Sequence, residues 1–291
     1  MSFSDLYLNS GTLITSSSDG VPLATIFGIP FDSTHSYKPG CRFGPDAIRE
    51  AFNNIEIFHP NFGIDLEDEK IKDLGNLTHT VVVKEMIGMI KKIMPEILAR
   101  DGPVIILGGE HSLTYATYTS LPKNVGYVVF DAHYDLRDSY AGERFSHAAY
   151  LRRIVEECGS ENILHVGARA FVREEMEFLN ENKIKTISDE QIKAGDGPEL
   201  LKKFASSFDS VYVSVDLDVL DPGYAPGVGN PEAVGITPRE LFDMIYSLDG
   251  VNIACADIVE LNPQFDNGAT SAIAAKIMSS VIAMCATGKK S

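Results

Sequence analysis

The sequence predicts an α/β fold in which helices cover both faces of a parallel β-sheet. Short apolar runs alternate along the chain with longer segments of helical periodicity, and this repeated order is typical of parallel sheets. The run at 125–130 is apolar throughout, which suits a strand buried on both faces. The chain has no internal repeat, low-complexity tract or linker, so we expect a single domain over residues 1–291.

The expected elements follow in chain order. Strands are predicted at 24–29, 104–107, 125–130, 163–166, 211–215 and 253–259. Helices are predicted to start near Pro45 and Thr237 and to cover 81–100, 112–120, 151–154, 172–182, 198–208 and 267–285. Pro45 suits a first helical turn, and Thr237 with Glu240 forms a capping pattern. Pro95 predicts a kink or an early end in its helix. The Gly- and Pro-rich segment 30–45 is long enough to predict a functional loop.

Composition excludes several classes of function. The formal net charge of −16 and the pI of about 4.8 argue against nucleic acid and anionic membranes as partners, but agree with a small cationic substrate. Four scattered cysteines without a CxxC pattern predict a reduced, intracellular protein. Residues 1–18 lack the features of a signal peptide. The apolar stretch 273–286 contains Lys276, and we expect it to be too short to cross a bilayer. The predicted location is the cytoplasm.

Side chains that can bind a metal follow the strand at 125–130. Asp131, His133 and Asp135 alternate along the chain, so in an extended segment they point the same way. They would lie at the carboxyl end of the strand, where open α/β sheets bind ligands. An alternative for this segment alone is a polar turn whose aspartates cap a helix.

Two further strand ends carry residues of the same kind. His111 follows the strand at 104–107, and Asp216 and Asp218 follow the strand at 211–215. Taken singly, each has an ordinary alternative, a helix-entry histidine or a solvated turn. Parallel strands present their carboxyl ends at one edge, so we expect all six side chains to share one cleft. Gly108-Gly109 is no phosphate loop, because no Gly-Lys-Ser/Thr follows it.

Charge balance then points to two cations. Four carboxylates in one cleft repel strongly unless positive charge compensates them. Two divalent ions match four carboxylates, and a water between them would be acidified by both. Oxygen-rich ligands with two imidazoles and no thiolate favour Mn²⁺ over a structural Zn²⁺. The pattern predicts a binuclear metal hydrolase, with the ions roughly 3.5–4 Å apart.

Several segments together resemble the ureohydrolases, the family of arginase and agmatinase. These segments are 28–32, 39–45, 108–112, 131–135, 214–222 and 259–263, and they occur in the family's order. The resemblance implies a three-layer α/β/α sandwich around a mostly parallel sheet of about eight strands. It also implies two Mn²⁺ ions, two of whose carboxylate ligands bridge them. The ligands it implies are His111, Asp131, His133, Asp135, Asp216 and Asp218.

Two further residues acquire roles through the resemblance. His147 matches the family's active-site histidine, which moves protons or stabilises the leaving amine, although Ala148 stands where the family has glycine. Glu260 matches the carboxylate that holds the guanidinium, a planar group that suits bidentate pairing. Without the resemblance, His147 would be taken for an exposed loop histidine and Glu260 for a surface residue. Asp135 is expected to help hold the substrate or to deliver a proton to the leaving amine.

The implied reaction is hydrolysis of a guanidino C–N bond, and agmatine is the expected substrate. The segment after Gly167-Ala168-Arg169 lacks the acidic group with which arginases grip an α-amine, and 136–146 and 221–227 look like agmatinases. Asp138 or Glu143 could favour the cationic tail of agmatine.

Other functions remain open at this point. Within the family they are arginase and guanidino-acid hydrolase, such as a guanidinobutyrase. A deacetylase of similar architecture would use one zinc ion. From another class, the chain could be a catalytically inactive regulatory or assembly module, for which six intact ligands would be unexpected. The resemblance also implies a homo-oligomer, a trimer or hexamer.

Overall fold

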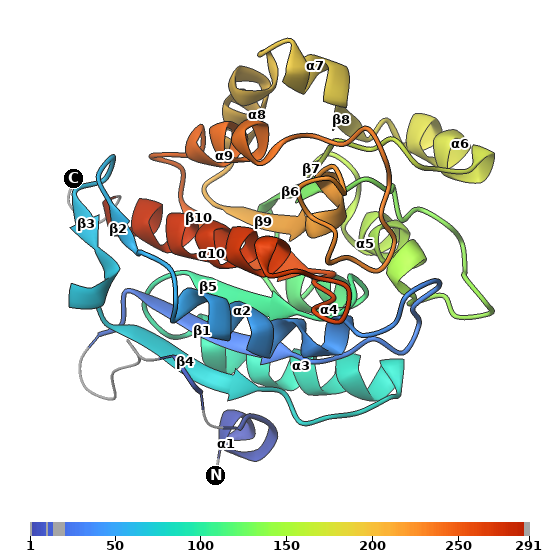
Figure 1. The fold of residues 1–291 in the computed structure, drawn as a ribbon. Coiled ribbons are helices and arrows are strands. Elements are labelled where there is room, and N and C mark those ends of the chain that lie inside the picture. The colour runs from blue at the N-terminus through green and yellow to red at the C-terminus, as the bar shows by residue number, and fades with distance from the viewer. Residues whose placement is uncertain (1, 10, 14–20, 288–291) are drawn as a thin grey trace.

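The computed structural model describes residues 2–9, 11–13 and 21–287 (Figure 1). Residues 1, 10 and 14–18 of the stretch considered above for a signal peptide lie outside them. The central feature is an eight-stranded sheet with the order β4-β1-β5-β10-β9-β6-β7-β8, in which every neighbouring pair is parallel. Its strands are β1 (Ala24–Ile29), β4 (Ile71–Asn76), β5 (Val104–Gly108), β6 (Gly126–Phe130), β7 (Ile163–Val166), β8 (Lys185–Ile187), β9 (Val211–Asp216) and β10 (Ile253–Val259).

Helices and short turns fill the connections between strands. The α-helices are α1 (Phe3–Tyr7), α2 (Gly44–Phe52), α3 (Val83–Leu98), α4 (Leu113–Tyr118), α5 (Tyr150–Cys158), α6 (Arg173–Asn182), α7 (Asp189–Lys193), α8 (Gly197–Ala205), α9 (Pro238–Tyr246) and α10 (Ala269–Thr287). The 3₁₀ turns are η1 (Cys41–Phe43), η2 (Leu66–Asp68), η3 (His147–Ala149) and η4 (Leu217–Val219). A separate antiparallel pair consists of β2 (Phe58–His59) and β3 (Ile64–Asp65).

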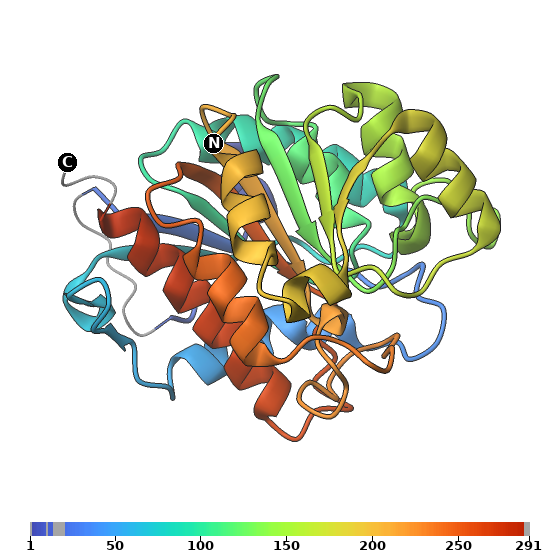
Figure 2. The same cartoon turned by 90° about the horizontal axis from the view of Figure 1, so that it is seen from above.

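The sheet separates two hydrophobic cores. Figure 2 shows from above the helices that flank the sheet. Side chains alternate between the two faces of a strand, so Ile105 and Leu107 belong to one core, and Val104 and Ile106 to the other. Residues of α2, α8, α9 and α10 complete the first core, and residues of α3, α4 and α5 complete the second. The predicted three-layer α/β/α sandwich with a parallel eight-stranded sheet is confirmed.

The sequence pattern located the inner strands and missed both edge strands. Three of the six predicted strands have the observed bounds, and the others differ by one residue at an end. β4 contains Asp73, Gly75 and Asn76, and β8 has only three residues, so neither has an apolar run. Of the two outcomes predicted for Pro95, a kink or an early end of the helix, the early end is not observed. The helix α3 continues to Leu98, because its buried face on both sides of the proline holds it against the sheet.

The prediction that the last apolar stretch is too short to cross a membrane is also corrected. By length and composition, Ala269–Ala286 could span a bilayer, although 67% of this window is buried inside the protein. The helix α10 packs against α2, α9 and β10. It is therefore a core helix in this structure, and its apolar character is explained by that packing.

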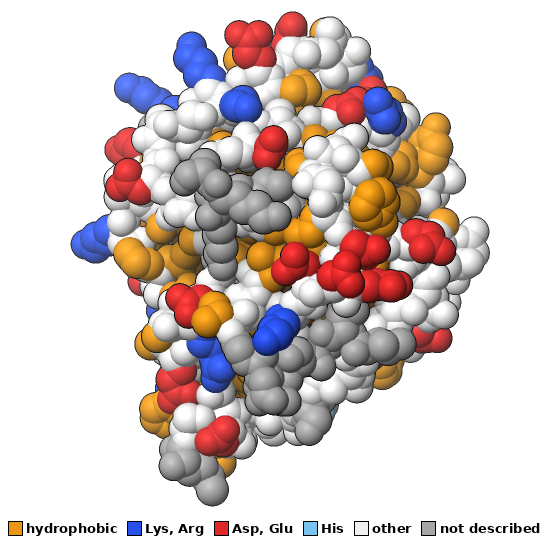
Figure 3. All heavy atoms as spheres, turned by 90° about the vertical axis from the view of Figure 1, so that its left-hand side faces the viewer, with side chains coloured by type: hydrophobic (Ala, Val, Ile, Leu, Met, Phe, Trp, Pro, Cys, Tyr) orange, Lys and Arg blue, Asp and Glu red, His pale blue; other side chains and the backbone are white. Residues whose placement is uncertain are grey.

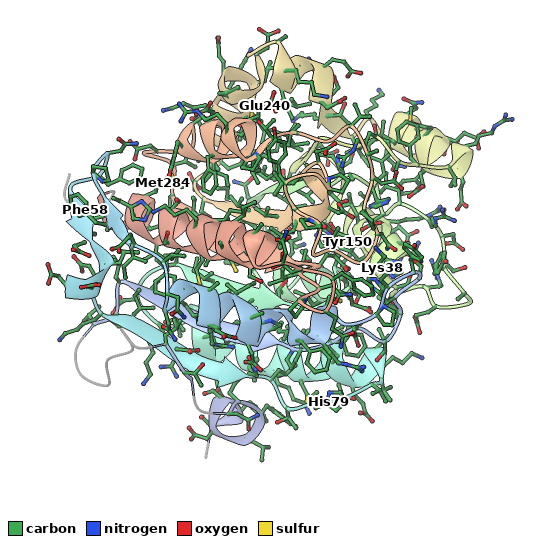
Figure 4. The ribbon with its side chains drawn as sticks, in the orientation of Figure 1. Lys38, Phe58, His79, Tyr150, Glu240 and Met284 are labelled. Carbon is green, nitrogen blue, oxygen red and sulfur yellow. The ribbon has the colours of Figure 1, made fainter. Side chains whose placement is uncertain are left out.

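The strand order places four site-bearing strands side by side at the centre of the sheet. These strands are β5, β10, β9 and β6, in that order. Tyr150 and Lys38 lie at the carboxyl end of the strands, and Phe58 and Met284 lie at the opposite end (Figure 4). Figure 3 views the molecule from the left-hand side of Figure 1, the end where Phe58 and Met284 lie, and shows hydrophobic side chains among scattered charged ones. The cleft at that end, of about 640 Å³, has no histidine among the described residues that line it.

Candidate metal centre and substrate cleft

The carboxyl ends of the four central strands carry the candidate ligands. His111 follows β5, residues 131–135 follow β6, and Glu260 follows β10. Asp216 ends β9. Its carboxylate caps the 3₁₀ turn η4 by accepting a 2.9 Å hydrogen bond from the backbone N–H of Asp218. This turn directs the carboxylates of Asp216 and Asp218 towards the same cleft.

A first cluster surrounds Nδ1 of His111. That nitrogen lies 3.0 Å from Oδ2 of Asp131, 3.1 Å from Oδ2 of Asp216 and 3.7 Å from Oδ2 of Asp135. All four side chains are buried. Four donor groups that converge at these separations form a pocket of the size that a cation needs.

A second cluster lies beside the first and shares one residue with it. Nδ1 of His133 lies 2.9 Å from Oδ2 of Asp218 and 3.6 Å from Oδ1 of Asp131. Asp131 thus turns one carboxylate oxygen to each cluster, which is the geometry of a bridging carboxylate. The structure brings together all six residues that the sequence predicted as ligands. The alternative of a solvated turn does not fit, because five of the six residues are buried, and the segment 131–135 caps no helix, since the next described helical element begins at His147.

The pKa shifts in this cluster indicate that it lacks positive charge. Burial, followed by the nearby Asp131 charge, raises the pKa of Asp135 well above its ordinary value, and burial with Asp218 does the same for Asp216. Burial opposes a charged His111, but hydrogen bonds to Asp131 and Asp216 outweigh it and raise its pKa well above the ordinary value. Without cations the carboxylates must share protons with the imidazoles. The donor set therefore fits divalent cations, which would take the place of those protons.

The other ring nitrogen of His111, Nε2, is positioned by two hydroxyl groups. Nε2 lies 2.9 Å from Oγ of Ser214 and 2.9 Å from the Tyr150 hydroxyl. Ser214 in turn donates to Asp257, which also accepts 2.6 Å hydrogen bonds from Thr114 and Tyr212. A partner of this kind fixes the ring and leaves Nδ1 available as a ligand.

Two functional residues have left-handed backbone conformations that non-glycine residues rarely adopt. The φ angles are 51° at Asp135 and 65° at Glu260. Such conformations cost about 1–3 kcal/mol each and persist only where the surrounding structure enforces them. At Glu260 the backbone N–H donates a 2.9 Å hydrogen bond to the carbonyl of Gly109. This strain turns the Glu260 side chain out of the strand direction and towards the site.

His147 is held by a residue pair that sequence reasoning missed. Its Nδ1 lies 3.1 Å from the Thr34 hydroxyl, and that hydroxyl donates a 2.6 Å hydrogen bond to Glu110. When Glu110 is ionised, the Thr34 hydroxyl gives it its one proton, and in that state Nδ1 of His147 carries a proton and Nε2 is the acceptor. Burial raises the pKa of Glu110 to about 7. His147 is buried, so the alternative of an exposed loop histidine is wrong. Burial, with the nearby His35, lowers the pKa of His147 to about 3.

Glu260 has one engaged and one available carboxylate oxygen. Oε1 accepts a 2.9 Å hydrogen bond from the backbone N–H of His111, and Oε2 is buried without a hydrogen-bond partner among the described residues. Burial raises the pKa of this carboxyl to about 7. Its low exposure excludes the alternative of a surface residue.

A cleft of about 520 Å³ opens onto both clusters. Asp135, His147 and Glu260 line it together with His133, Asp216 and Asp218. Other lining residues include Arg137, Tyr140, Glu175 and Glu232. The expectation for Asp138 and Glu143 is not met, since neither lines the cleft. Asp138 instead pairs with Arg144 and Arg153 at 3.4 and 3.2 Å.

Comparison with known proteins identifies the family. The model of the "Arginase family" matches residues 23–284. The chain belongs to the arginase family. An agmatinase of Pyrococcus horikoshii is 38% identical over 265 residues, covering 90% of this chain and 91% of the relative. An agmatinase of Bacillus cereus is 36% identical over 259 residues, covering 86% and 87%. The crystal structure of the agmatine ureohydrolase of Thermoplasma volcanium has a TM-score of 0.90 and 34% identity, covering 97% of this chain and 96% of that one.

The outer residues of this arginase-family site were not found from the sequence. Thr34 and Glu110 lie 76 positions apart, and no spacing rule connects them. Tyr150 and Ser214 carry hydroxyls that are indistinguishable in sequence from ordinary core polar groups. The only available signal for Glu110 was its place inside the Gly-Gly-Glu-His-Ser segment. Gly109 explains part of that segment, because a Cβ there would collide with the backbone of Phe31.

Proposed function

We propose that this protein hydrolyses a guanidino C–N bond, converting agmatine to putrescine and urea. The observation that carries the proposal is the position of Glu260. Its side chain lines the same cleft as residues of both His/Asp clusters, and its Oε2 has no hydrogen-bond partner among the described residues. A carboxylate so placed can pair with a guanidinium next to a hydrolytic centre. Membership of the arginase family supports the same reaction class.

Two Mn²⁺ ions are the proposed cofactors. His111, Asp131, Asp135 and Asp216 would hold one, and Asp131, His133 and Asp218 the other, with Asp131 common to both. Oxygen-rich ligands with two imidazoles suit Mn²⁺. When bound, such a pair supplies Lewis acidity and lowers the pKa of water.

The protein's own side chains orient the substrate and move the proton. Glu260 follows β10 and Asp135 follows β6, on either side of β9, and the two carboxyl groups would hold the guanidinium between them in the cleft that both line. His147 is neutral at pH 7, because burial lowers its pKa to about 3. Its Nε2 would take the proton from the attacking water and give it to the departing amine nitrogen. An amine cannot leave as its anion, so this transfer is required.

The charges along the cleft favour a cationic tail. Glu175 and Glu232 both line the cleft, Glu232 at 3.7 Å from Nε2 of His133, and either carboxylate can attract the primary ammonium of agmatine. One feature favours a second candidate, a guanidino acid such as 4-guanidinobutyrate. Arg137 also lines the cleft, and a guanidinium is a strong partner for a carboxylate.

A side-by-side assay tests the proposal. Mn²⁺-loaded protein is supplied with agmatine, arginine and 4-guanidinobutyrate, and urea is measured. Agmatine should give the highest kcat/KM, and Glu260→Gln should lower that value by about a hundredfold or more, since a charge-assisted pair is lost. Arg137→Ala should leave agmatine turnover largely intact. Higher turnover of 4-guanidinobutyrate, abolished in Arg137→Ala, would move the assignment to a guanidino-acid hydrolase. Urea release from no guanidino compound would contradict the reaction class.

Location and assembly form part of the same proposal. We propose a cytoplasmic homo-oligomer, a trimer or hexamer. Family resemblance supports the assembly, and the buried free thiols of Cys41 and Cys255 agree with a reducing compartment. Light scattering of the Mn²⁺-loaded protein tests the assembly, and a monomer would contradict it.

A further inference from the structure

A third group of potential metal ligands lies beside the substrate cleft. It consists of His35, Cys41 and Glu260, whose donor atoms all lie within 4.8 Å of one another. Nδ1 of His35 is 3.6 Å from Oε2 of Glu260 and 4.0 Å from Sγ of Cys41. The side chains of His35 and Glu260 are 2% and 5% exposed, and Cys41 is fully buried. None of these three belongs to the two His/Asp clusters.

The separations fit a cation better than they fit direct hydrogen bonds. An N–H···O hydrogen bond spans about 2.7–3.2 Å, so 3.6 Å between His35 and Glu260 is too long for one. The edges of a tetrahedral zinc site with N, O and S ligands are about 3.3–3.7 Å, as follows from metal–ligand bonds of 2.0–2.3 Å. The 3.6 Å separation of His35 from Glu260 lies within this range, and the 4.0 Å separation of Nδ1 of His35 from Sγ of Cys41 exceeds it by a few tenths of an ångström.

An unsatisfied polar atom gives a second, independent indication. Oε2 of Glu260, which faces Nδ1 of His35 at 3.6 Å, is buried and has no hydrogen-bond partner among the described residues. Buried polar atoms are almost always paired. An imidazole and a carboxylate that face each other at 3.6 Å without a hydrogen bond leave room for a positive ion between them.

The loop that carries His35 and Cys41 is fixed in place. The Asn262 side chain donates hydrogen bonds of 2.8 and 3.1 Å to the carbonyls of Lys38 and Pro39. The backbone N–H of Gly40 donates a 2.9 Å hydrogen bond to Asp32. Gly229 packs directly against the His35 ring, where a Cβ would collide with Nε2. The three donors are therefore held together before any ion arrives, which reduces the cost of binding.

We propose that His35, Cys41 and Glu260 form a third, inhibitory metal site that selects Zn²⁺ or Co²⁺ over Mn²⁺. A thiolate, an imidazole and a carboxylate suit the softer ions, whereas Mn²⁺ prefers oxygen. Three protein ligands leave a fourth position for water. On binding, the Cys41 thiol releases its proton to solvent and a metal–sulfur bond forms.

Inhibition follows from the shared carboxylate. The ion would occupy Oε2 of Glu260, which is the oxygen left free for the guanidinium. Zn²⁺ and agmatine would then compete for one atom. This consequence rests on the proposed function, but binding of the ion does not.

Cobalt absorption tests binding without any turnover. Mn²⁺-loaded protein is titrated with Co²⁺, and the thiolate-to-cobalt charge-transfer band in the near ultraviolet is followed, with metal content measured by mass spectrometry. The native protein should show the band and bind a third ion. Cys41→Ala and the similarly sized Cys41→Ser should lose both. Cys158→Ser, which alters an exposed thiol outside the cluster, is the matched control and should behave as native.

Zinc inhibition of urea release from agmatine gives the second readout. Loss of an outer-shell residue alone costs 10–100-fold in metal affinity, so Cys41→Ala should raise the inhibitory Zn²⁺ concentration by roughly tenfold or more without changing basal activity. Inhibition of the native protein should be competitive with agmatine. A native protein without the band, or a band that persists in both Cys41 variants, would overturn the site. If no urea is released at all, the proposed function fails and the absorption experiment still decides the third site.

Discussion

The hydroxyl of Tyr150 lies 2.9 Å from Nε2 of His111, the ring nitrogen that does not face the carboxylate cluster. Tyr150 also lies 3.0 Å from the hydroxyl of Tyr127, and all three side chains are buried. The rings of Tyr150 and His111 stack with their centroids 4.3 Å apart. Tyr150 therefore fixes the orientation of a predicted metal ligand without reaching the metal pocket.

Removing that hydroxyl should weaken metal binding. We expect Tyr150→Phe to lower Mn²⁺ affinity by about tenfold, as for other residues that orient a ligand, because His111 then keeps only Ser214 as a partner. The measurement is the Mn²⁺ concentration that half-restores urea release in metal-stripped protein. Tyr118→Phe is the control, since that hydroxyl donates to the carbonyl of Val125 instead. Equal affinities in both variants would contradict this role.

Thr34 should matter for the rate more than for binding. We expect Thr34→Val to lower kcat by about tenfold to a hundredfold with little change in KM, because a misdirected general base loses much of its 10²–10⁴-fold contribution. Thr34→Ser keeps the hydroxyl that lies 3.1 Å from His147 and should retain most of the rate. Steady-state kinetics of both variants, at equal metal content, provides the measurement. A Thr34→Ser rate as low as that of Thr34→Val would show that packing is responsible.

The buried ion pair of Arg49 and Asp73 should dominate stability on the β4 side of the sheet. Nε of Arg49 donates to Oδ2 of Asp73 at 2.9 Å, and Nη2 donates to Oδ1 at 3.0 Å. Arg49→Met leaves a buried carboxylate without its cation, so we expect a loss of about 3–5 kcal/mol in the free energy of unfolding. Arg239→Met, which breaks an exposed pair with Asp243, should cost at most about 1 kcal/mol. Denaturant unfolding followed by circular dichroism compares the two.

His59 should make the folded state sensitive to mild acid. Burial, with a contribution from Lys276, lowers the pKa of His59 from 6.5 to about 4. The unfolded chain therefore binds more protons than the folded protein between these values, and stability falls as the pH drops from 6.5 towards 4. His59→Gln should flatten the pH dependence of the unfolding free energy in that window. His79→Gln, at an exposed histidine, is the control, and the same flattening there would contradict the assignment.

Removing divalent cations should lower thermal stability. Mn²⁺ that binds only the folded state stabilises it by mass action, by about 2.7 kcal/mol at a hundred times its dissociation constant. A chelator should therefore lower the Tm of the native protein. In Asp131→Asn the shift should largely vanish, since Asp131 belongs to both clusters. An undiminished shift in that variant would place the stabilising ion elsewhere.

The sequence allowed prediction of those parts of the site that depend on strand ends. The position of a ligand directly after a buried strand determines which edge of the sheet it occupies, so convergence of His111, Asp131 and Asp216 could be expected before any coordinates. The assignment of these side chains as metal ligands stays a prediction. The strand order itself was not predicted, because the periodicity of β5 or β9 does not say that β10 lies between them.

The residues that position the site side chains depend on contacts that no local sequence pattern encodes. Thr34 reaches His147 across 113 positions, and the Tyr150 hydroxyl reaches His111 across 39. The acidic residues suggested for the substrate tail, Asp138 and Glu143, do not line the cleft. Asp138 pairs with Arg144 and Arg153 instead, and Glu143 accepts a hydrogen bond from the backbone N–H of Phe145. Side-chain pairing of this kind is decided by packing.

The place of β10 in the sheet has a consequence for synthesis of the chain. It is the last strand to be made, yet it lies between β5 and β9 at the middle of the sheet. A nascent chain that ends before Ile253 therefore has two halves with no strand to join them, and both exposed edges can pair with other chains. Translation must pass beyond Glu260 before the sheet closes, so premature termination should yield aggregates instead of a partly active fragment.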